Sequence, residues 1–257
     1  NRRMDIQRKD EILALSAQGK VDRGNIERIL ARKVRTEKLA IKDIKLRTFI
    51  AEGSSRNDLA AHVYDVTYGC IRTGEDTMVV IDDSIVRGTT LTRSILRILD
   101  RLKPRRIIVV SSSPQVRYPD YYGIDLANLQ ELAAFRALID MLLRDGRRAD
   151  IDRAFEKAVA NLEKPAEEEV NAVKDLYALY SYEEISQHIA QMLTPAGIDA
   201  KVDILFQTVE GLHQAVPSSP GDWYFSGDYP TPGGTRNVNR GFRDYYLQTF
   251  LPSGTEI

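Results

Sequence analysis

Apolar residues recur along much of the chain with the spacing of amphipathic helices, and two short apolar runs have the length of buried strands. Residues 4–18 and 22–34 place apolar side chains three and four positions apart, which predicts two helices before residue 40. The apolar runs 78–81 and 107–110 stand on either side of a helical stripe over 91–102. A strand, a helix and a strand within about 35 residues predict a crossover between two parallel strands.

The rest of the chain is predicted to be rich in helices and then in loops. The periodicity predicts four further helices, over 126–144, 151–162, 167–180 and 182–193. Ser181 and Glu184 have the spacing of a capping box at the start of the last helix. Residues 202–206 return to a strand pattern, and proline and glycine are frequent over 217–257, where aromatic side chains need a surface on which to pack.

Together these elements predict an α/β protein with a mostly parallel sheet flanked by helices, an extra helical insertion and a loop-rich C-terminal tail. We divide the chain into four parts. Residues 1–40 are a helical lead-in or linker, 41–135 the core, 136–200 the helical insertion, and 201–257 a strand, a helix and the aromatic, loop-rich tail.

Charge is balanced over the whole chain but not along it. The 257 residues include 36 Lys and Arg against 37 Asp and Glu, which argues against a nucleic-acid-binding surface. Residues 1–50 hold 14 basic and 7 acidic side chains, a local charge of +7 that is typical of a solvated helical linker or of a segment facing an anionic ligand. There is no run of 18 apolar residues, so the sequence predicts no membrane span.

The single cysteine and the first residues bear on the cellular compartment and on what precedes this chain. Cys70 is the single cysteine, which excludes an intrachain disulfide and favours a reducing, cytoplasmic location. The chain starts at Asn1, and no apolar core of a signal peptide follows. We therefore expect a cytoplasmic fragment whose upstream part is missing.

The strand at 78–81 is followed by a nine-residue turn that unites groups suited to a sugar phosphate. The turn reads Asp82-Asp83-Ser84-Ile85-Val86-Arg87-Gly88-Thr89-Thr90. At the carboxyl end of a parallel strand, backbone N–H groups at a helix start attract an anion, and Gly88 permits a close approach. The adjacent carboxylates of Asp82 and Asp83 accept hydrogen bonds from vicinal hydroxyls and attract Mg²⁺. The turn therefore indicates a ribose 5-phosphate with a metal-bound leaving group, and ordinary helix capping is the plainer alternative.

This turn resembles a known signature. The stretch VVIDDSIVRGTT (79–90) resembles the phosphoribosyl pyrophosphate (PRPP) motif of phosphoribosyltransferases, and IVRGTT resembles that of the amidophosphoribosyltransferase family. Four other stretches resemble the same family in the same order: LRTFI (46–50), SSPQVRYPDYYGID (112–125) followed by Glu131-Leu132, ILFQTVEGL (204–212) and YFSGDYP (224–230). The chain is thus similar to the phosphoribosyltransferase part of this family.

The resemblance implies a type I phosphoribosyltransferase-like fold and a role for each motif residue. Asp82 and Asp83 would bind the ribose hydroxyls and help to hold Mg²⁺, and Ser84 to Thr90 would bind the 5-phosphate. Arg47 would lie on the pyrophosphate side, so Arg47, Asp82 and Asp83 are the expected catalytic residues. The implied reaction is PRPP plus ammonia giving 5-phosphoribosylamine and pyrophosphate, the first step of purine synthesis.

The resemblance also implies partners. Ammonia would come from glutamine in an N-terminal glutaminase domain that this chain lacks, so we expect the fragment alone to be inactive with glutamine. Purine nucleotide effectors and a homo-oligomer are expected, without nucleic acid or membrane partners.

The chain departs from the family pattern at several points. Cys70 is internal, so we interpret it as a structural thiol rather than the glutaminase nucleophile. Pro119 is followed by Asp120 where some members place a cluster-binding cysteine, so no iron–sulfur cluster is expected. The segment 51–74, usually rich in Lys and Arg, offers Arg56 and Arg72 as its cations. The family's first strand has no counterpart before residue 47.

Two alternatives stay open from the sequence. One is a PRPP-dependent phosphoribosyltransferase that acts on a nucleobase, although no base-binding hood is recognisable. The other is a non-catalytic regulator that binds PRPP or a nucleotide, which the cation-poor segment 51–74 favours.

Overall fold

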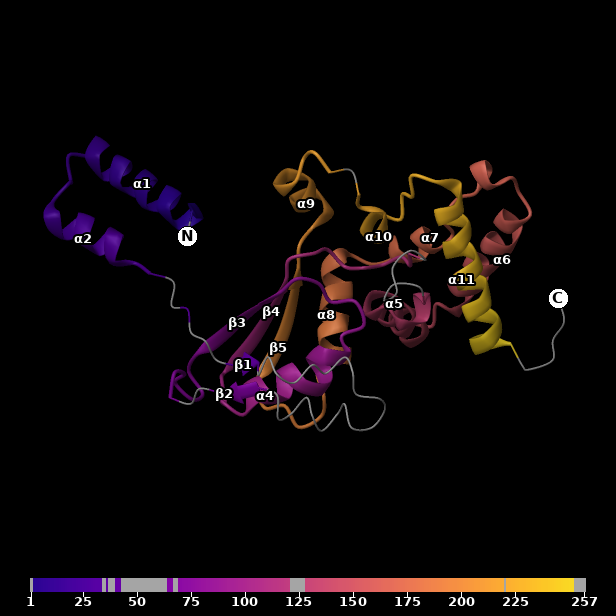
Figure 1. The fold of residues 1–257 in the computed structure, drawn as a ribbon, viewed down its shortest axis with the longest axis horizontal. Helices are drawn as coiled ribbons and strands as arrows, with labels where there is room; N and C mark the ends of the chain where they lie inside the picture. The colour runs from indigo at the N-terminus through magenta and orange to yellow at the C-terminus, as the bar shows by residue number, and fades with distance from the viewer. Residues whose placement is uncertain are drawn as a thin grey trace. The chain divides into compact units, whose positions relative to one another are not determined.

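A computed structural model gives the fold and divides the chain into two compact units, Asn1–Ile41 and Lys42–Ile257 (Figure 1). The residues that it describes are 2–33, 36, 40–42, 64–66, 69–120, 128–219 and 221–251.

The first unit contains a pair of helices, α1 (Arg2–Ala17) and α2 (Arg23–Ala31). Asp22 begins α2, and its carboxylate accepts a hydrogen bond from the backbone N–H of Asn25 at 2.8 Å. Ile29 is buried between the two helices' contact surfaces. The two helices predicted from apolar spacing are therefore confirmed. A short two-stranded sheet of β1 (Ala40–Lys42) and β2 (Tyr64–Val66) follows along the chain.

The second unit is built on a three-stranded sheet with the order β3-β4-β5, in which both pairs are parallel. Its strands are β3 (Thr77–Asp82), β4 (Arg106–Ser111) and β5 (Lys201–Phe206). Strands β3 and β4 are joined by one continuous helical segment, formed by a π-helical turn (Leu91–Ile95) and α4 (Leu96–Asp100). The predicted crossover between parallel strands is confirmed.

The two faces of this sheet differ in burial. Ile107 and Ile204 point to one face and are buried, because α8 packs against β5 on that side. On the opposite face, Val79, Ile81 and Leu205 are 61%, 73% and 54% exposed. The run 78–81 is therefore a strand, as predicted, but in the described part of the chain it is buried on one face only.

Helices make up most of the remaining chain. They are a 3-10 turn (Leu129–Glu131), α5 (Ala133–Arg144), α6 (Arg148–Leu162), a 3-10 turn (Ala166–Glu168), α7 (Val173–Tyr177), α8 (Tyr182–Leu193), α9 (Val209–Ala215), α10 (Trp223–Ser226) and α11 (Pro232–Phe250). The predicted capping box is present: the backbone N–H of Glu184 donates to Ser181 Oγ at 3.2 Å, and the backbone N–H of Ser181 donates to Glu184 Oε2 at 2.7 Å. Helix α8 packs against both β5 and α5, which places it between the sheet and the other helices (Figure 1).

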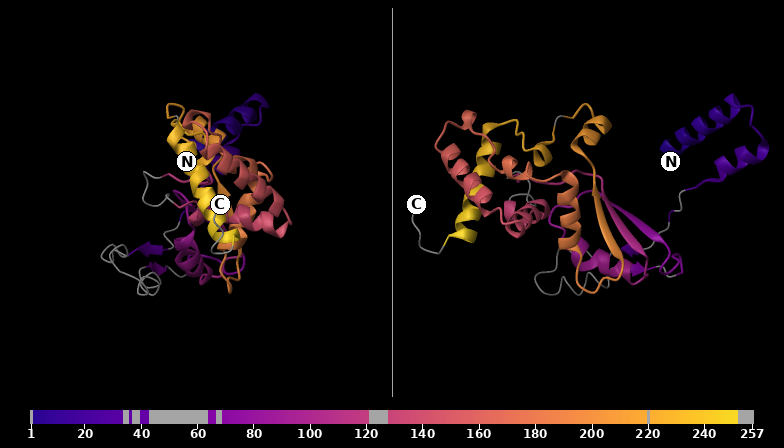
Figure 2. Two further views of the ribbon diagram at one scale, coloured as in Figure 1. Left: turned by 90° about the vertical axis from the view of Figure 1, so that its right-hand side faces the viewer. Right: turned by 180° about the vertical axis from the view of Figure 1, so that it is seen from behind.

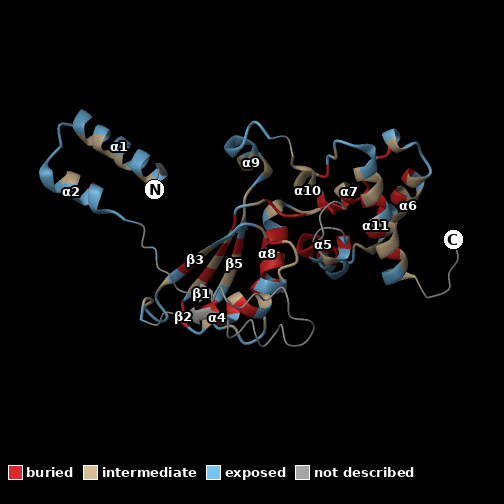
Figure 3. Ribbon diagram, viewed as in Figure 1, coloured by how far each residue is buried: buried red, intermediate tan, exposed pale blue. Residues whose placement is uncertain are grey.

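The C-terminal tail differs from the loop-rich prediction, because residues 232–250 form the long helix α11, which lies beside α6 (Figure 2). Val238, Phe242 and Tyr246 recur every four residues and are buried, and the ring of Tyr246 stacks on that of Phe155 with centroids 4.0 Å apart. Figure 3 shows the buried residues concentrated in the helices around α5 and α8, with buried positions also along the strands of the sheet. The parallel sheet with flanking helices matches the predicted α/β fold class.

Candidate functional site

The paired carboxylates of the motif lie at the carboxyl end of β3. Asp82 is the last residue of the strand, and the backbone carbonyls of Asp82 and Asp83 accept hydrogen bonds from Ser112 N and Ser113 N at 2.9 and 3.0 Å. Strand pairing with the segment after β4 therefore holds the backbone of both aspartates. Both side chains are exposed, as a ligand-binding pair requires.

Each carboxylate uses one oxygen within the turn itself. Asp82 Oδ1 accepts from the backbone N–H of Asp83 at 3.0 Å, and Asp83 Oδ1 accepts from that of Ser84 at 2.6 Å. These bonds orient both side chains and leave the Oδ2 atoms outside the turn's own hydrogen bonds. Two oriented carboxylates with exposed oxygens are suited to accept hydrogen bonds from neighbouring hydroxyl groups.

The same two carboxylates have the chemistry of a magnesium site that is completed by a substrate. Within the residues that the structure describes, no group of three or more His, Cys, Asp or Glu side chains could hold a metal ion. Mg²⁺ is commonly bound by one or two carboxylates together with substrate oxygens and water rather than by a complete protein cage. Asp82 and Asp83 therefore fit a magnesium ion that is shared with a substrate, and Mg²⁺ remains a prediction.

The second half of the motif forms the start of the crossover helix. Gly88 has φ +73°, in the left-handed region that favours glycine, and its carbonyl accepts from Thr92 N at 3.0 Å. Thr89 and Thr90 form the first helical residues and are exposed. Their backbone N–H groups belong to the first turn, where intrahelical partners are missing and the helix dipole favours an anion. This is the arrangement expected for the predicted phosphate-binding loop.

The middle of the motif is fixed by burial and by a charge pair. Ile85 is buried, 4% exposed, so it anchors the loop in the protein interior. Arg87 forms an ion pair with Glu131 at 2.6 Å, and Val86 O accepts from Ala133 N at 2.8 Å. Glu131, which belongs to a stretch that resembles the family, therefore orients the guanidinium of Arg87.

The other stretches of the resemblance fall partly within the described chain. Arg47 lies outside the described residues, as does Arg56 of the segment 51–74. Arg72 is described and pairs with Asp76 at 2.8 Å. The structure therefore shows where the predicted ribose and phosphate residues lie, and their roles, like that of Arg47 on the pyrophosphate side, stay predictions.

Two of the resembling stretches meet in the structure although about 100 residues separate them in sequence. The backbone N–H groups of Arg117 and Tyr118 both donate to Tyr224 O, at 2.8 and 3.0 Å. Asp120 is buried, and burial together with a hydrogen bond to Asp120 raises the pKa of Tyr224. Asp120, the residue after Pro119, therefore presents a carboxylate that is hydrogen-bonded to Tyr224. The absence of an iron–sulfur cluster stays a prediction.

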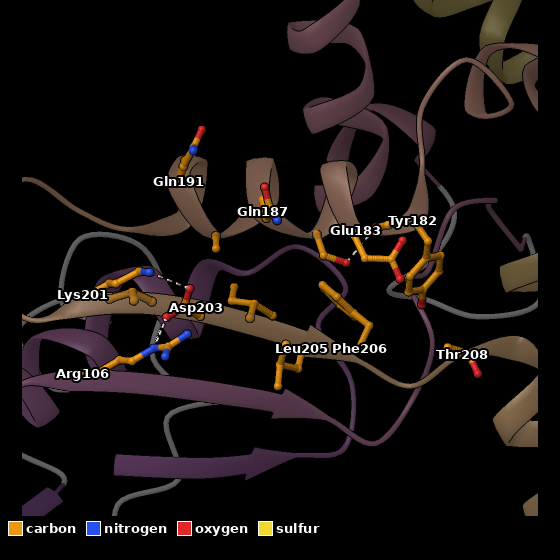
Figure 4. Close-up of a pocket in the computed structure, with 14 residues that line it drawn as sticks. Arg106, Tyr182, Glu183, Gln187, Gln191, Lys201, Asp203, Leu205, Phe206 and Thr208 are labelled. Carbon is orange, nitrogen blue, oxygen red and sulfur yellow. Dashed lines mark hydrogen bonds and ion pairs between the residues drawn. The ribbon is translucent and has the colours of Figure 1, made fainter. Parts of the chain in front are cut away.

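A cavity at another part of the described chain does not include the motif. A cavity of about 600 Å³ runs between α8 and the outer edge of β5, where Asp203 pairs with Arg106 at 2.5 Å and faces Lys201 (Figure 4). None of the nine motif residues lines it. The chemistry of the motif, rather than the size of this cavity, therefore identifies the candidate site.

Comparison with known proteins agrees with the motif. No family model matches the chain. It is similar to three curated proteins named amidophosphoribosyltransferase, from Haemophilus influenzae (36% identity over 66 residues), Pyrococcus horikoshii (46% over 57) and Methanocaldococcus jannaschii (34% over 88). These alignments cover 26%, 22% and 34% of this chain, and 13%, 12% and 18% of the respective relatives.

The chain thus matches less than a fifth of the length of these relatives. No described helix is long and apolar enough to cross a membrane. The resemblance predicted from the PRPP-type motif is confirmed: over about a fifth to a third of its length, the chain is similar to amidophosphoribosyltransferases.

Proposed function

We propose that the chain is the phosphoribosyltransferase part of an amidophosphoribosyltransferase, which converts PRPP and ammonia to 5-phosphoribosylamine and pyrophosphate. The observation that supports this most is the motif itself. Two exposed, oriented carboxylates end β3, and a left-handed glycine followed by two exposed threonines starts the next helix. The similarity to curated enzymes of that name supports the same reaction.

The carboxylates act on the ribose. Asp82 and Asp83 accept hydrogen bonds from the two ring hydroxyls through the oxygens that the turn leaves exposed. As pyrophosphate departs from C1, positive charge develops on the sugar ring, and two nearby carboxylates stabilise that charge. Asp82 and Asp83 would hold Mg²⁺ together with PRPP, and the ion would supply positive charge that stabilises the leaving pyrophosphate. The structure's own contribution is the fixed direction of both side chains.

The loop acts on the 5-phosphate. Backbone N–H groups of the first helical turn and the hydroxyls of Thr89 and Thr90 donate to phosphate oxygens, and the helix dipole adds a favourable potential. Gly88 allows the backbone to turn there without the steric cost of a side chain. Arg87 supplies positive charge beside the loop while Glu131 holds its guanidinium. These contacts fix one end of the substrate so that the bond at C1 is placed for attack.

The proposal also includes the leaving group, the source of ammonia and the setting of the reaction. Arg47 stabilises the leaving pyrophosphate, and ammonia arrives from glutamine hydrolysed in an N-terminal domain of the full-length protein. Ammonia is itself a nucleophile, so no strong base is required, but it needs protection from water and protonation. Purine nucleotides as effectors, a homo-oligomer and a cytoplasmic location complete the proposed setting.

The test is pyrophosphate release by the full-length natural protein. With Mg²⁺ and PRPP we expect release that depends on ammonia and is unchanged by added purine or pyrimidine bases. Release that requires a nucleobase would replace this proposal with a base phosphoribosyltransferase. Binding of AMP or GMP without any pyrophosphate release would instead identify a regulator.

A further inference from the structure

The phosphate loop is supported from outside the motif by the last residue of α8. Leu193 ends that helix, and its side chain is 3% exposed. A Cβ added at Gly88 would lie 2.4 Å from Leu193 Cδ1 and 2.5 Å from Cδ2, so the isobutyl group occupies the space beside the glycine. The glycine and the leucine are 105 positions apart in sequence, and the fold brings them into contact.

A hydrogen bond joins the same two elements. Thr92 Oγ1 donates to the backbone carbonyl of Leu193 at 2.8 Å. That carbonyl is one of the last four of α8, which lack partners within the helix, so the threonine hydroxyl caps it. Thr92 stands in the first turn after Gly88, and its N–H donates to the carbonyl of Gly88. The end of α8 therefore contacts the start of the phosphate-binding helix through both packing and a hydrogen bond.

The opposite end of α8 is fixed as well. Tyr182 OH donates to Gln207 O at 2.7 Å and accepts from Gln115 N at 2.8 Å. Gln115 Nε2 donates to Ser186 Oγ at 2.8 Å, so the segments after β4 and β5 both hold the first turns of the helix. Burial raises the pKa of the Tyr182 hydroxyl to about 12, and the hydroxyl is protonated and donates at neutral pH, as tyrosine hydroxyls do. A helix held at its first turns is a rigid support for whatever contacts its last residue.

From these contacts we propose that Leu193 is a positioning residue for the 5-phosphate of PRPP, acting through Gly88 and Thr92. This rests on the proposed function. In this proposal Leu193 acts without touching the substrate: it fills the space beside Gly88 and keeps the backbone N–H groups of the loop aimed before the substrate arrives. Without the leucine side chain, the loop becomes ordered only when the substrate binds, and the cost of this ordering reduces the net binding free energy. Removing the side chain therefore weakens binding of the phosphate more than it slows the chemical step.

The test compares four single substitutions in the full-length natural protein by pyrophosphate release from PRPP and ammonia. Leu193→Ala should raise the KM for PRPP about tenfold or more while kcat changes less than about threefold. Thr92→Val, which removes the hydroxyl, should raise the same KM several-fold. Leu193→Met conserves the side-chain volume and should restore the wild-type KM to within about twofold.

The matched control is Leu176→Ala, because Leu176 is an equally buried leucine in α7 of the same helical block. It should lower the urea midpoint of unfolding and leave the KM for PRPP within about twofold of wild type. A Leu193→Ala protein with the same KM as this control would overturn the inference, as would a Leu193→Met protein as impaired as Leu193→Ala. If Leu193→Ala does not fold, the KM of Thr92→Val is the test, and a KM for PRPP equal to that of wild type would overturn the inference.

A second readout separates this inference from the proposed function. Ribose 5-phosphate needs the phosphate loop but no leaving group, so its affinity is measured by titration calorimetry on the same proteins. An inactive wild type that binds ribose 5-phosphate refutes the proposed reaction, and the inference then stands or falls on whether Leu193→Ala weakens that binding. A wild type that neither binds nor reacts refutes both.

Discussion

Replacing Gly88 with alanine is the sharpest single perturbation of the proposed phosphate loop. The residue has φ +73°, where a Cβ costs about 1–2 kcal/mol in a non-glycine residue. The new methyl group would also lie 2.4 and 2.5 Å from the two terminal methyl carbons of Leu193, much closer than van der Waals contact. Forcing an extra methyl group into packed surroundings costs about 1–3 kcal/mol more.

The backbone cost and the steric cost can be separated, because only the steric cost depends on Leu193. If the loop kept its present conformation, the alanine variant would lose about 2–5 kcal/mol of unfolding free energy, the sum of both costs. We expect the loop to shift instead, with a measured loss of about 1–3 kcal/mol in the free energy of unfolding and a large rise in the KM for PRPP. In the double variant Gly88→Ala, Leu193→Ala the steric cost disappears, while the backbone cost remains.

Urea unfolding and steady-state pyrophosphate release measure the two effects. The double variant should be less destabilised than the sum of the two single variants by about 1 kcal/mol or more, because the two positions are in contact. Additive losses would show that the predicted clash is absent. A Gly88→Ala protein with wild-type stability and an unchanged KM would refute the reasoning about the loop altogether.

Two further predictions concern the helices that support the site. Phe242→Ala should lower the free energy of unfolding by about 3–5 kcal/mol, because the ring is fully buried in α11 and packs edge-to-face on Phe135. Urea denaturation measures this loss, and a loss below about 1 kcal/mol would contradict the position of α11. The backbone N–H of Ser181 lowers the pKa of Glu184, so the capping box stabilises α8 fully above the ordinary carboxyl pKa and loses that contribution as the pH falls through the lowered value. Thermal unfolding between pH 7 and 3 should therefore show a steeper acid loss in wild type than in Glu184→Gln, and parallel curves would contradict it.

Local patterns in the sequence predict the elements whose signals are local. The capping spacing of Ser181 and Glu184 places the start of α8 correctly, and its apolar spacing gives the end at Leu193. The apolar runs of β3 and β4 and the stripe between them give the parallel crossover, because period and length suffice for that inference. The motif residues fall where the crossover predicts, at the carboxyl end of a parallel strand.

The tail shows where local signals mislead. Pro232, Gly233 and Gly234 read as a loop, yet the proline occupies the first turn of α11, where its missing N–H costs nothing. The helix is stabilised by tertiary packing of Val238 and Phe242 rather than by propensity. Burial of this face was therefore not predictable without knowing that α6 lies beside it.

The contacts of the site were the least predictable feature. Glu131 lies 44 positions from Arg87, and nothing in the sequence pairs these two charges or places Leu193 against Gly88. Such contacts depend on how α5 and α8 pack, which periodicity does not specify. The exposure of one face of β3 was also not predictable. Apolar residues occupy both faces of the strand, so the sequence shows no alternation of apolar and polar positions.

The central claim is that Asp82, Asp83 and the loop after them bind PRPP. Titration calorimetry of Mg²⁺ and PRPP into the full-length natural protein tests it most directly, with the double variant Asp82→Asn, Asp83→Asn as the comparison. Both substitutions keep the side-chain shape and remove the charge. The account predicts saturable binding to wild type and at least about a tenfold loss of affinity in the double variant, since each lost hydrogen bond to a charged group is worth about 1.5–3 kcal/mol. Equal affinity in the two proteins, or no binding to wild type, would contradict it.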